Sequence, residues 1–166
     1  GGFINAYSEK GEGTTFTLYL PAIEEVVVEQ SPRGAQRKVL HGHGTVLVVD
    51  DEKEINNVAE DIIKSLGYRV LVVESGKEAV SFYEQRKGEI DLVILDMIMP
   101  GMGGGEVYDR LKKIDPEVKV ILSSGYSKDG KAQEILARGC NGFIQKPFNM
   151  EHLSWKIREI LDAGVG

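Results

Sequence analysis

The sequence has little cysteine, no long apolar run and no excess of positive charge, and each shortage excludes a class of protein. Cys140 is the single cysteine, so a disulfide framework and a cysteine-rich zinc site are excluded and a reducing compartment is favoured. No apolar run reaches the roughly 18–20 residues that a membrane-spanning helix needs, and the start of the chain lacks a signal-peptide pattern. We therefore expect a cytoplasmic chain without a membrane segment.

The charge balance argues against binding to nucleic acid. Lys and Arg number 20, Asp and Glu number 26, and the formal net charge is −6, whereas nucleic-acid-binding domains normally carry a basic patch. Hydrophobic residues make up 42% of the 166 residues, which is enough to build a core. The length allows one ordinary domain and a short additional segment.

The first 43 residues differ in pattern from the rest. Residues 1–22 hold two β-rich runs around a loop with Gly11 and Gly13, followed by Pro21, which predicts a short β-hairpin. Because a lone hairpin is marginally stable in water, we expect it to belong to a larger unit. Residues 23–43 combine an acidic and apolar stretch with glycine and proline breakers, and we interpret them as a linker.

From residue 44 to 166, five mostly apolar runs alternate with five amphipathic segments. The runs are typical of strands buried on both faces of a parallel sheet, and the amphipathic segments have helical spacing. The predicted strands lie at 46–49, 70–73, 92–95, 118–122 and 142–145. The apolar positions of the first predicted helix are Ile55, Val58, Ala59, Ile62, Ile63 and Leu66. This alternation predicts an α/β domain with a five-stranded parallel sheet covered by helices on both faces.

Polar side chains gather where these strands end. They are Asp50 and Asp51 after the first strand, Asp96 after the third, Ser123 and Ser124 at the fourth, and Lys146 after the fifth. Each could be a helix cap, a turn residue or a solvated charge. In parallel α/β sheets, however, ligands bind beyond the carboxyl ends of the strands. The occurrence of these polar residues at several strand ends therefore favours a common site.

Three neighbouring carboxylates suggest a specific chemistry. They repel one another unless a cation joins them, and oxygen ligands with room for water suit Mg²⁺. One Asp can then attack a phosphoryl group to form an aspartyl phosphate, while a Lys and a hydroxyl stabilise the phosphoryl oxygens. Asp96 is the best candidate for the nucleophile, because its central strand lies between the acidic pair and the Ser and Lys residues.

Four segments of the second part form a recognisable set. They read TVLVVDDE at 45–52, LDMIMPGMGG at 95–104, SSGY at 123–126 and QKPF at 145–148. In this order and spacing, the four segments resemble the response-regulator receiver domain of two-component signalling, over about residues 44–164. The resemblance implies a flavodoxin-like, doubly wound fold with strand order 2-1-3-4-5.

The resemblance also implies a metal site and a phosphoacceptor. Asp96 would accept a phosphoryl group from the phosphohistidine of a histidine kinase or a phosphotransfer domain. Asp51 would bind Mg²⁺ directly and Asp50 through water, with Asp96 and the backbone carbonyl of Ile98 as further ligands. The domain would catalyse its own phosphorylation and dephosphorylation.

Three further residues match positions of the family's site, and two of them match its switch. Lys146 would pair with the phosphoryl group, and the peptide bond before Pro147 would be cis. Ser124 matches the switch hydroxyl and Phe143 the rotating aromatic residue. Because Phe143 has no hydroxyl, the hydrogen bond that a Tyr would make in the switch is not expected here. Phosphorylation would alter the face made by the fourth helix, fifth strand and fifth helix, where a partner or a second copy could dock, and Trp155 is expected to contribute to such a surface.

Residues 2–21 resemble the closing hairpin of the histidine-kinase ATPase domain. The order of hairpin remnant (1–22), linker (23–43) and receiver (44–166) implies the C-terminal part of a hybrid sensor kinase. The phosphoacceptor helix and nucleotide-binding boxes of a kinase are not found in this sequence, so we do not expect this chain to bind ATP or to phosphorylate itself on histidine.

Three alternative functions are weighed against the phosphoacceptor. An aspartyl-phosphate phosphatase usually has a second Asp two residues after its nucleophile, where this sequence has Ile98. A flavodoxin-like electron carrier would need a loop rich in Ser, Thr and Gly after the first strand, and Asp50 and Asp51 would repel the FMN phosphate. A docking module that works without phosphorylation is disfavoured by the intact set of acids and Lys146.

Overall fold

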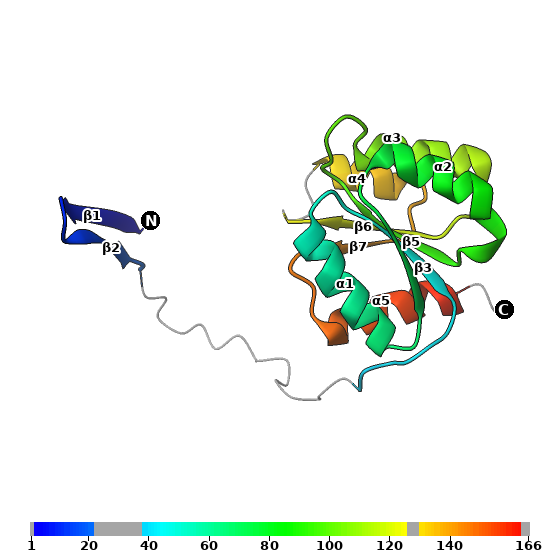
Figure 1. The fold of residues 1–166 in the computed structure, drawn as a ribbon, viewed down its shortest axis with the longest axis horizontal. Helices are drawn as coiled ribbons and strands as arrows, with labels where there is room; N and C mark the ends of the chain where they lie inside the picture. The colour runs from blue at the N-terminus through cyan, green and yellow to red at the C-terminus, as the bar shows by residue number, and fades with distance from the viewer. Residues whose placement is uncertain (1, 22–37, 126–129, 164–166) are drawn as a thin grey trace. The chain divides into compact units, whose positions relative to one another are not determined.

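The computed structural model describes residues 2–21, 38–125 and 130–163. The chain divides into two compact units, Gly1–Gln36 and Arg37–Gly166, which are described separately (Figure 1). Of the expected linker 23–43, residues 23–37 lie outside the described residues, as does Tyr126 of the SSGY segment. None of the helices in the described ranges has the length and apolar character needed to cross a membrane.

The N-terminal unit contains the predicted β-hairpin. Strand β1 (Phe3–Glu9) pairs antiparallel with β2 (Gly13–Tyr19). Gly11 and Gly13 have φ values of 94° and 103° in the connecting turn, a left-handed region that glycine adopts without a steric penalty. The rings of Phe3 and Tyr19 stack with centroids 4.4 Å apart. All residues of both strands are exposed, so this hairpin has no core of its own.

The second unit contains a five-stranded parallel sheet. Its strands are β3 (Thr45–Val49), β4 (Arg69–Val73), β5 (Leu92–Asp96), β6 (Val120–Ser124) and β7 (Gly142–Gln145). Their spatial order is β4-β3-β5-β6-β7. Counted within this unit the order is 2-1-3-4-5, which confirms the predicted fold.

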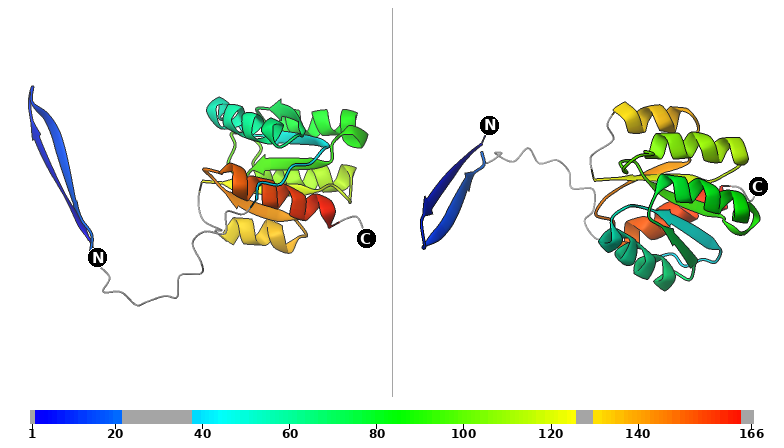
Figure 2. Two further views of the ribbon diagram at one scale, coloured as in Figure 1. Left: turned by 90° about the horizontal axis from the view of Figure 1, so that it is seen from below. Right: turned by 45° about the horizontal axis from the view of Figure 1, so that its top comes forward.

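Five helices cover the two faces of this sheet (Figures 1 and 2). They are α1 (Lys53–Ser65), α2 (Gly76–Arg86), α3 (Gly104–Ile114), α4 (Gly130–Ala137) and α5 (Met150–Asp162), with a short 3-10 turn η1 (Lys87–Glu89). Helices α1 and α5 pack on one face, and α2, α3 and α4 pack on the other. The central strands are apolar up to their ends because side chains alternate between two covered faces.

Helix α1 differs from its predicted burial at Val58, which is 53% exposed. The buried residues of the helix are Asn56, Ala59 and Ile63. These positions form a stripe with spacings of three and four residues, and Val58 lies about 100° away from Ala59 around the helix axis. Val58 is therefore on the rim of the helix, where the sheet does not cover it.

Residues 38–44, which we call the strap, begin the second unit ahead of its first strand and pack against the rest of it. The backbone N–H of Leu40 donates to Ser154 Oγ at 3.3 Å, and that of Gly42 donates to the carbonyl of Leu66 at 2.9 Å. Val39 packs against the core between α1, α5 and the sheet. Any side chain at Gly42 would overlap the buried hydroxyl end of Tyr68. The strap thus touches both helices of one layer.

The substitution Gly42→Ala is expected to lower the free energy of unfolding by about 1–3 kcal/mol, because the added methyl group collides with the enclosed ring of Tyr68. Urea unfolding measures this change. The exposed neighbour His41 provides the control, and His41→Ala should stay within about 0.5 kcal/mol of the unmodified chain. Equal stability of the two variants would show that the strap does not pack as described.

Candidate active site

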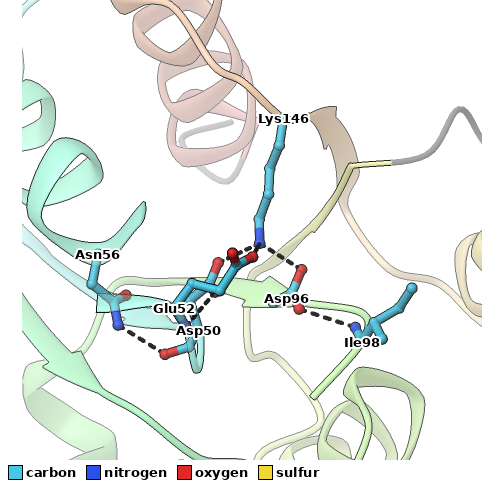
Figure 3. Close-up of polar contacts among 6 residues, drawn as sticks. All are labelled: Asp50, Glu52, Asn56, Asp96, Ile98 and Lys146. Atoms are coloured by element: carbon cyan, nitrogen blue, oxygen red, sulfur yellow. Dashed lines mark hydrogen bonds and ion pairs between the residues drawn. The ribbon is translucent and has the colours of Figure 1, made fainter. Parts of the chain in front are cut away.

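Asp50, Asp96 and Lys146, all predicted from the strand ends, meet at one edge of the sheet (Figure 3). Asp50 follows β3, Asp96 is the last residue of β5, and Lys146 follows β7. Asp50 and Asp96 are buried, whereas Asp51 is exposed. One carboxylate oxygen from each of the three Asp residues lies within 4.8 Å of the other two. The predicted common site is therefore present.

Lys146 bridges the two buried carboxylates. Its Nζ atom lies 2.5 Å from Asp50 Oδ2 and 2.9 Å from Asp96 Oδ1, and a further 3.9 Å contact reaches the exposed Glu52. The backbone N–H of Lys146 donates to the carbonyl of Ser124 at 2.8 Å, and the Lys146–Pro147 peptide bond is cis, as the resemblance implied. The lysine is thereby held against the end of β6.

Backbone groups orient both buried carboxylates. The N–H of Ile98 donates to Asp96 Oδ2 at 3.1 Å, and the N–H of Glu52 donates to Asp50 Oδ1 at 3.1 Å. The Asn56 side chain donates through Nδ2 to the backbone carbonyl of Asp50 at 2.8 Å. The sequence analysis did not identify Glu52 or Asn56 as part of this site. The sequence offered one signal for Asn56, namely its helical spacing of three and seven residues from the apolar Ala59 and Ile63.

The surroundings shift the pKa values of two groups in the site. Burial raises the pKa of Asp96, and the negative charge of Asp50 adds to this, while Lys146 and the Ile98 N–H act in the opposite direction. Burial alone would lower the pKa of Lys146, but its hydrogen bonds and attraction to Asp50 and Asp96 prevail and raise it. The lysine is therefore held as a cation between two acids.

The two predicted switch residues lie on neighbouring strands. Ser124 is buried at the end of β6, and Phe143 is half-buried on β7, where it packs on the side of α2, α3 and α4. In the strand register Asp96 lies opposite Ser123, and Ser124 lies opposite Gln145. The roles of Ser124 and Phe143 in a switch stay predictions.

A comparison with known families agrees with this geometry. The model of the response regulator receiver domain matches residues 46–158. The chain belongs to this family. The receiver domain thus accounts for the sheet, its helices and the acidic edge, whereas the hairpin and the strap lie ahead of the matched residues.

Individual relatives extend the comparison. Sensor kinase CckA of Brucella abortus is 38% identical over 169 residues, and the alignment covers 98% of this chain and 18% of that kinase. Chemotaxis protein CheY of Thermotoga maritima is 36% identical over 104 residues, which are 62% of this chain and 85% of CheY. A solved structure, the CheX–CheY–BeF₃–Mg²⁺ complex from Borrelia burgdorferi, aligns with a TM-score of 0.68 and 28% sequence identity. The alignment covers 70% of this chain and 88% of the matched chain in that structure. This chain spans less than a fifth of CckA.

The receiver site is able to bind a metal ion. Asp50, Asp51 and Asp96 offer oxygen ligands only, and with Lys146 as a cation these three carboxylates leave two negative charges uncompensated. Mg²⁺ prefers oxygen ligands and retains several waters, and the exposed Asp51 leaves room for them. The donor set therefore fits Mg²⁺.

The substitution Asp96→Asn is expected to stabilise the metal-free protein at neutral pH by on the order of 1 kcal/mol, because it removes a buried charge that burial and Asp50 disfavour. The raised pKa means that folded Asp96 binds a proton more tightly than unfolded Asp96. The ordinary pKa of an Asp side chain is 3.8. As pH rises from this value through the raised pKa of folded Asp96, the stability of the wild type relative to Asp96→Asn should fall, and above the raised pKa it should level off.

Urea unfolding in EDTA across this pH range measures the difference. The control is Asp61→Asn on the exposed side of α1, which should leave stability nearly unchanged. An Asp96→Asn protein that is less stable than the wild type at pH 7 contradicts this account of the site.

Proposed function

We propose that this receiver is a phosphoacceptor, in which Asp96 takes a phosphoryl group from a phosphohistidine in a Mg²⁺-dependent reaction and thereby switches the conformation of the domain. The observation that carries the proposal is the buried contact of Lys146 with both Asp50 and Asp96, beside the third carboxylate of Asp51. Buried charges of this kind are costly for folding and gather at functional sites.

The metal site is proposed to use four groups. They are the carboxylates of Asp51 and Asp96, the backbone carbonyl of Ile98, and Asp50 acting through water. When bound, Mg²⁺ supplies positive charge that neutralises the oxygens of the phosphoryl group. The structural support is the oxygen-only donor set and its uncompensated charge.

In the proposed transfer, a carboxylate oxygen of Asp96 attacks the phosphorus atom of the phosphohistidine. A phosphorus–oxygen bond forms as the phosphorus–nitrogen bond breaks, and the electron pair of the broken bond stays on the imidazole nitrogen of the donor. Lys146 Nζ, 2.9 Å from Asp96, is placed to stabilise the charge on the transferred oxygens. The N–H of Ile98 holds the other carboxylate oxygen in place.

The proposed switch runs from the site to the face of α4, β7 and α5. Ser124 would donate its hydroxyl hydrogen to the phosphoryl group, and Phe143 on β7 would change its packing in response. Such a local charge event biases a two-state rearrangement. Trp155, 39% exposed on α5, belongs to the face that we propose for a partner or a second copy.

The central test is labelling with radioactive acetyl phosphate. With Mg²⁺ present, the wild type should acquire a base-labile label, and Asp96→Asn should lose at least 90% of it because the attacking oxygen is gone. Asp51→Asn should slow labelling at low Mg²⁺ concentration. The control is Asp91→Asn, at the amino end of the sheet where its carboxylate accepts from Thr45 N–H, and it should label normally. Equal labelling of Asp96→Asn and the wild type would refute the proposal and leave a docking module as the alternative.

An apolar rim next to Lys146 is the proposed docking surface for the donor. A surface pocket of about 140 Å³ is lined by Ile55, Val58, Lys146, Pro147 and Phe148. Val58 is apolar although its side chain is 53% exposed, and the lysine of the site lines the same pocket. A donor that packs its apolar side chains here would bring its phosphohistidine to the edge of the sheet.

Val58→Asp is expected to lower the rate of transfer from a protein donor by about tenfold, because it places a desolvated charge in the interface, while labelling by acetyl phosphate stays unchanged. Phosphorylated sensor kinase CckA of Brucella abortus is a suitable probe, because 98% of this chain aligns with 18% of that kinase. Trp155→Ala, on the second proposed partner surface at α5, is the comparison variant. If Trp155→Ala lowers the transfer rate and Val58→Asp does not, the donor docks on α5 instead.

The N-terminal unit is proposed to be the closing hairpin of a histidine-kinase ATPase domain, followed by the linker and the receiver of a hybrid sensor kinase. Two observations support this arrangement. The similarity to CckA covers 98% of the chain and so includes hairpin residues, and the exposed apolar side chains of β1 and β2 call for a larger unit to cover them.

A further inference from the structure

Among the buried residues of α1, Asn56 is the polar one, and its amide contacts the loop that carries the acidic pair. Asn56 is 3% exposed. Its Nδ2 atom donates to the backbone carbonyl of Asp50 at 2.8 Å (Figure 3). Its Oδ1 atom is buried and has no hydrogen-bond partner among the described residues. The amide nitrogen is therefore hydrogen-bonded, whereas the amide oxygen is not.

Packing alone does not explain an amide at this position. The neighbouring positions of the buried stripe, Ala59 and Ile63, are apolar and completely enclosed. Asn is a weak helix former because its side chain competes for backbone hydrogen bonds, and a buried acceptor without a partner is destabilising. Groups of this kind in folded proteins call for a specific explanation.

We infer that Asn56 is a positioning residue for the acidic pair, an inference that rests on the proposed binding of Mg²⁺. The Asp50 carbonyl that it holds belongs to the peptide bond between Asp50 and Asp51. Because a peptide bond is planar, fixing this oxygen sets the direction in which the chain continues into Asp51. Asp51 is exposed, so packing does little to hold it.

The other contacts of the loop act on different atoms. Lys146 and the N–H of Glu52 hold the carboxylate of Asp50, and the N–H of Asn56 itself donates to the Glu52 carbonyl at 3.0 Å. The side chain of Asn56 is the group that holds the Asp50–Asp51 peptide from the side of α1. It prearranges the metal ligands before the ion arrives, which lowers the ordering needed for binding.

The test compares identical substitutions at two adjacent asparagines. Asn56→Leu replaces the amide by an apolar side chain with the same branching and number of non-hydrogen atoms, and Asn57→Leu makes the same change at an exposed position of α1. Calorimetric titration with Mg²⁺ gives the dissociation constant of each folded protein, and urea unfolding in EDTA gives its stability. We expect Asn56→Leu to raise the Mg²⁺ dissociation constant about 3- to 10-fold, the range for one lost hydrogen bond, and Asn57→Leu to leave it unchanged.

A second readout separates positioning from folding. Acetyl phosphate labelling of Asn56→Leu should be slow at low Mg²⁺ and should recover at saturating Mg²⁺, which a general loss of structure would not allow. If Asn56→Leu does not fold, Asn56→Ala is measured in its place. A wild-type affinity for Mg²⁺ in the folded Asn56 variant overturns the inference, whereas a wild type that binds no Mg²⁺ overturns the proposed function itself.

Discussion

The site depends on the enclosure of like charges where two parallel strands end, beside the lysine that follows a third strand. Because helices cover both faces of the sheet, the ends of β3 and β5 are shielded from solvent, and Asp50 and Asp96 are buried there. Lys146 joins these carboxylates, but Asp51 leaves the site with excess negative charge. A divalent cation and a phosphoryl group are the pair of ligands that such a site suits, because the ion offsets the charge that the acids and the phosphoryl oxygens bring together.

Helix α1 links this chemistry to recognition. Its buried stripe carries Asn56, which contacts the loop of the acidic pair, and its rim carries the exposed Val58 beside Lys146. The strap meets the far end of the same helix, where Gly42 donates to the Leu66 carbonyl. One helix therefore contacts the loop of the acids, offers an apolar surface at their edge and connects to the chain that precedes the receiver.

The sheet and the acidic edge could be predicted from the sequence, because each depends on a pattern that one strand carries by itself. Apolar runs mark buried strands, and the residue after each run must lie at the carboxyl edge, which located Asp50, Asp96 and Lys146. The contact between Asn56 and Asp50 depends on the rotation of α1 about its axis, which also decides that Val58 is exposed. The strap is held largely by backbone hydrogen bonds, which leave no periodic pattern of side chains to detect.

The identity of the phosphorylated atom is the most direct test of this account. Acetyl phosphate and Mg²⁺ are added, the acyl phosphate is reduced with borohydride, and peptide mass spectrometry locates the product. The account predicts homoserine at position 96 and unmodified aspartate at positions 50 and 51. Homoserine at either of those positions, or phosphate retained on a histidine or serine with Asp96 intact, would contradict it.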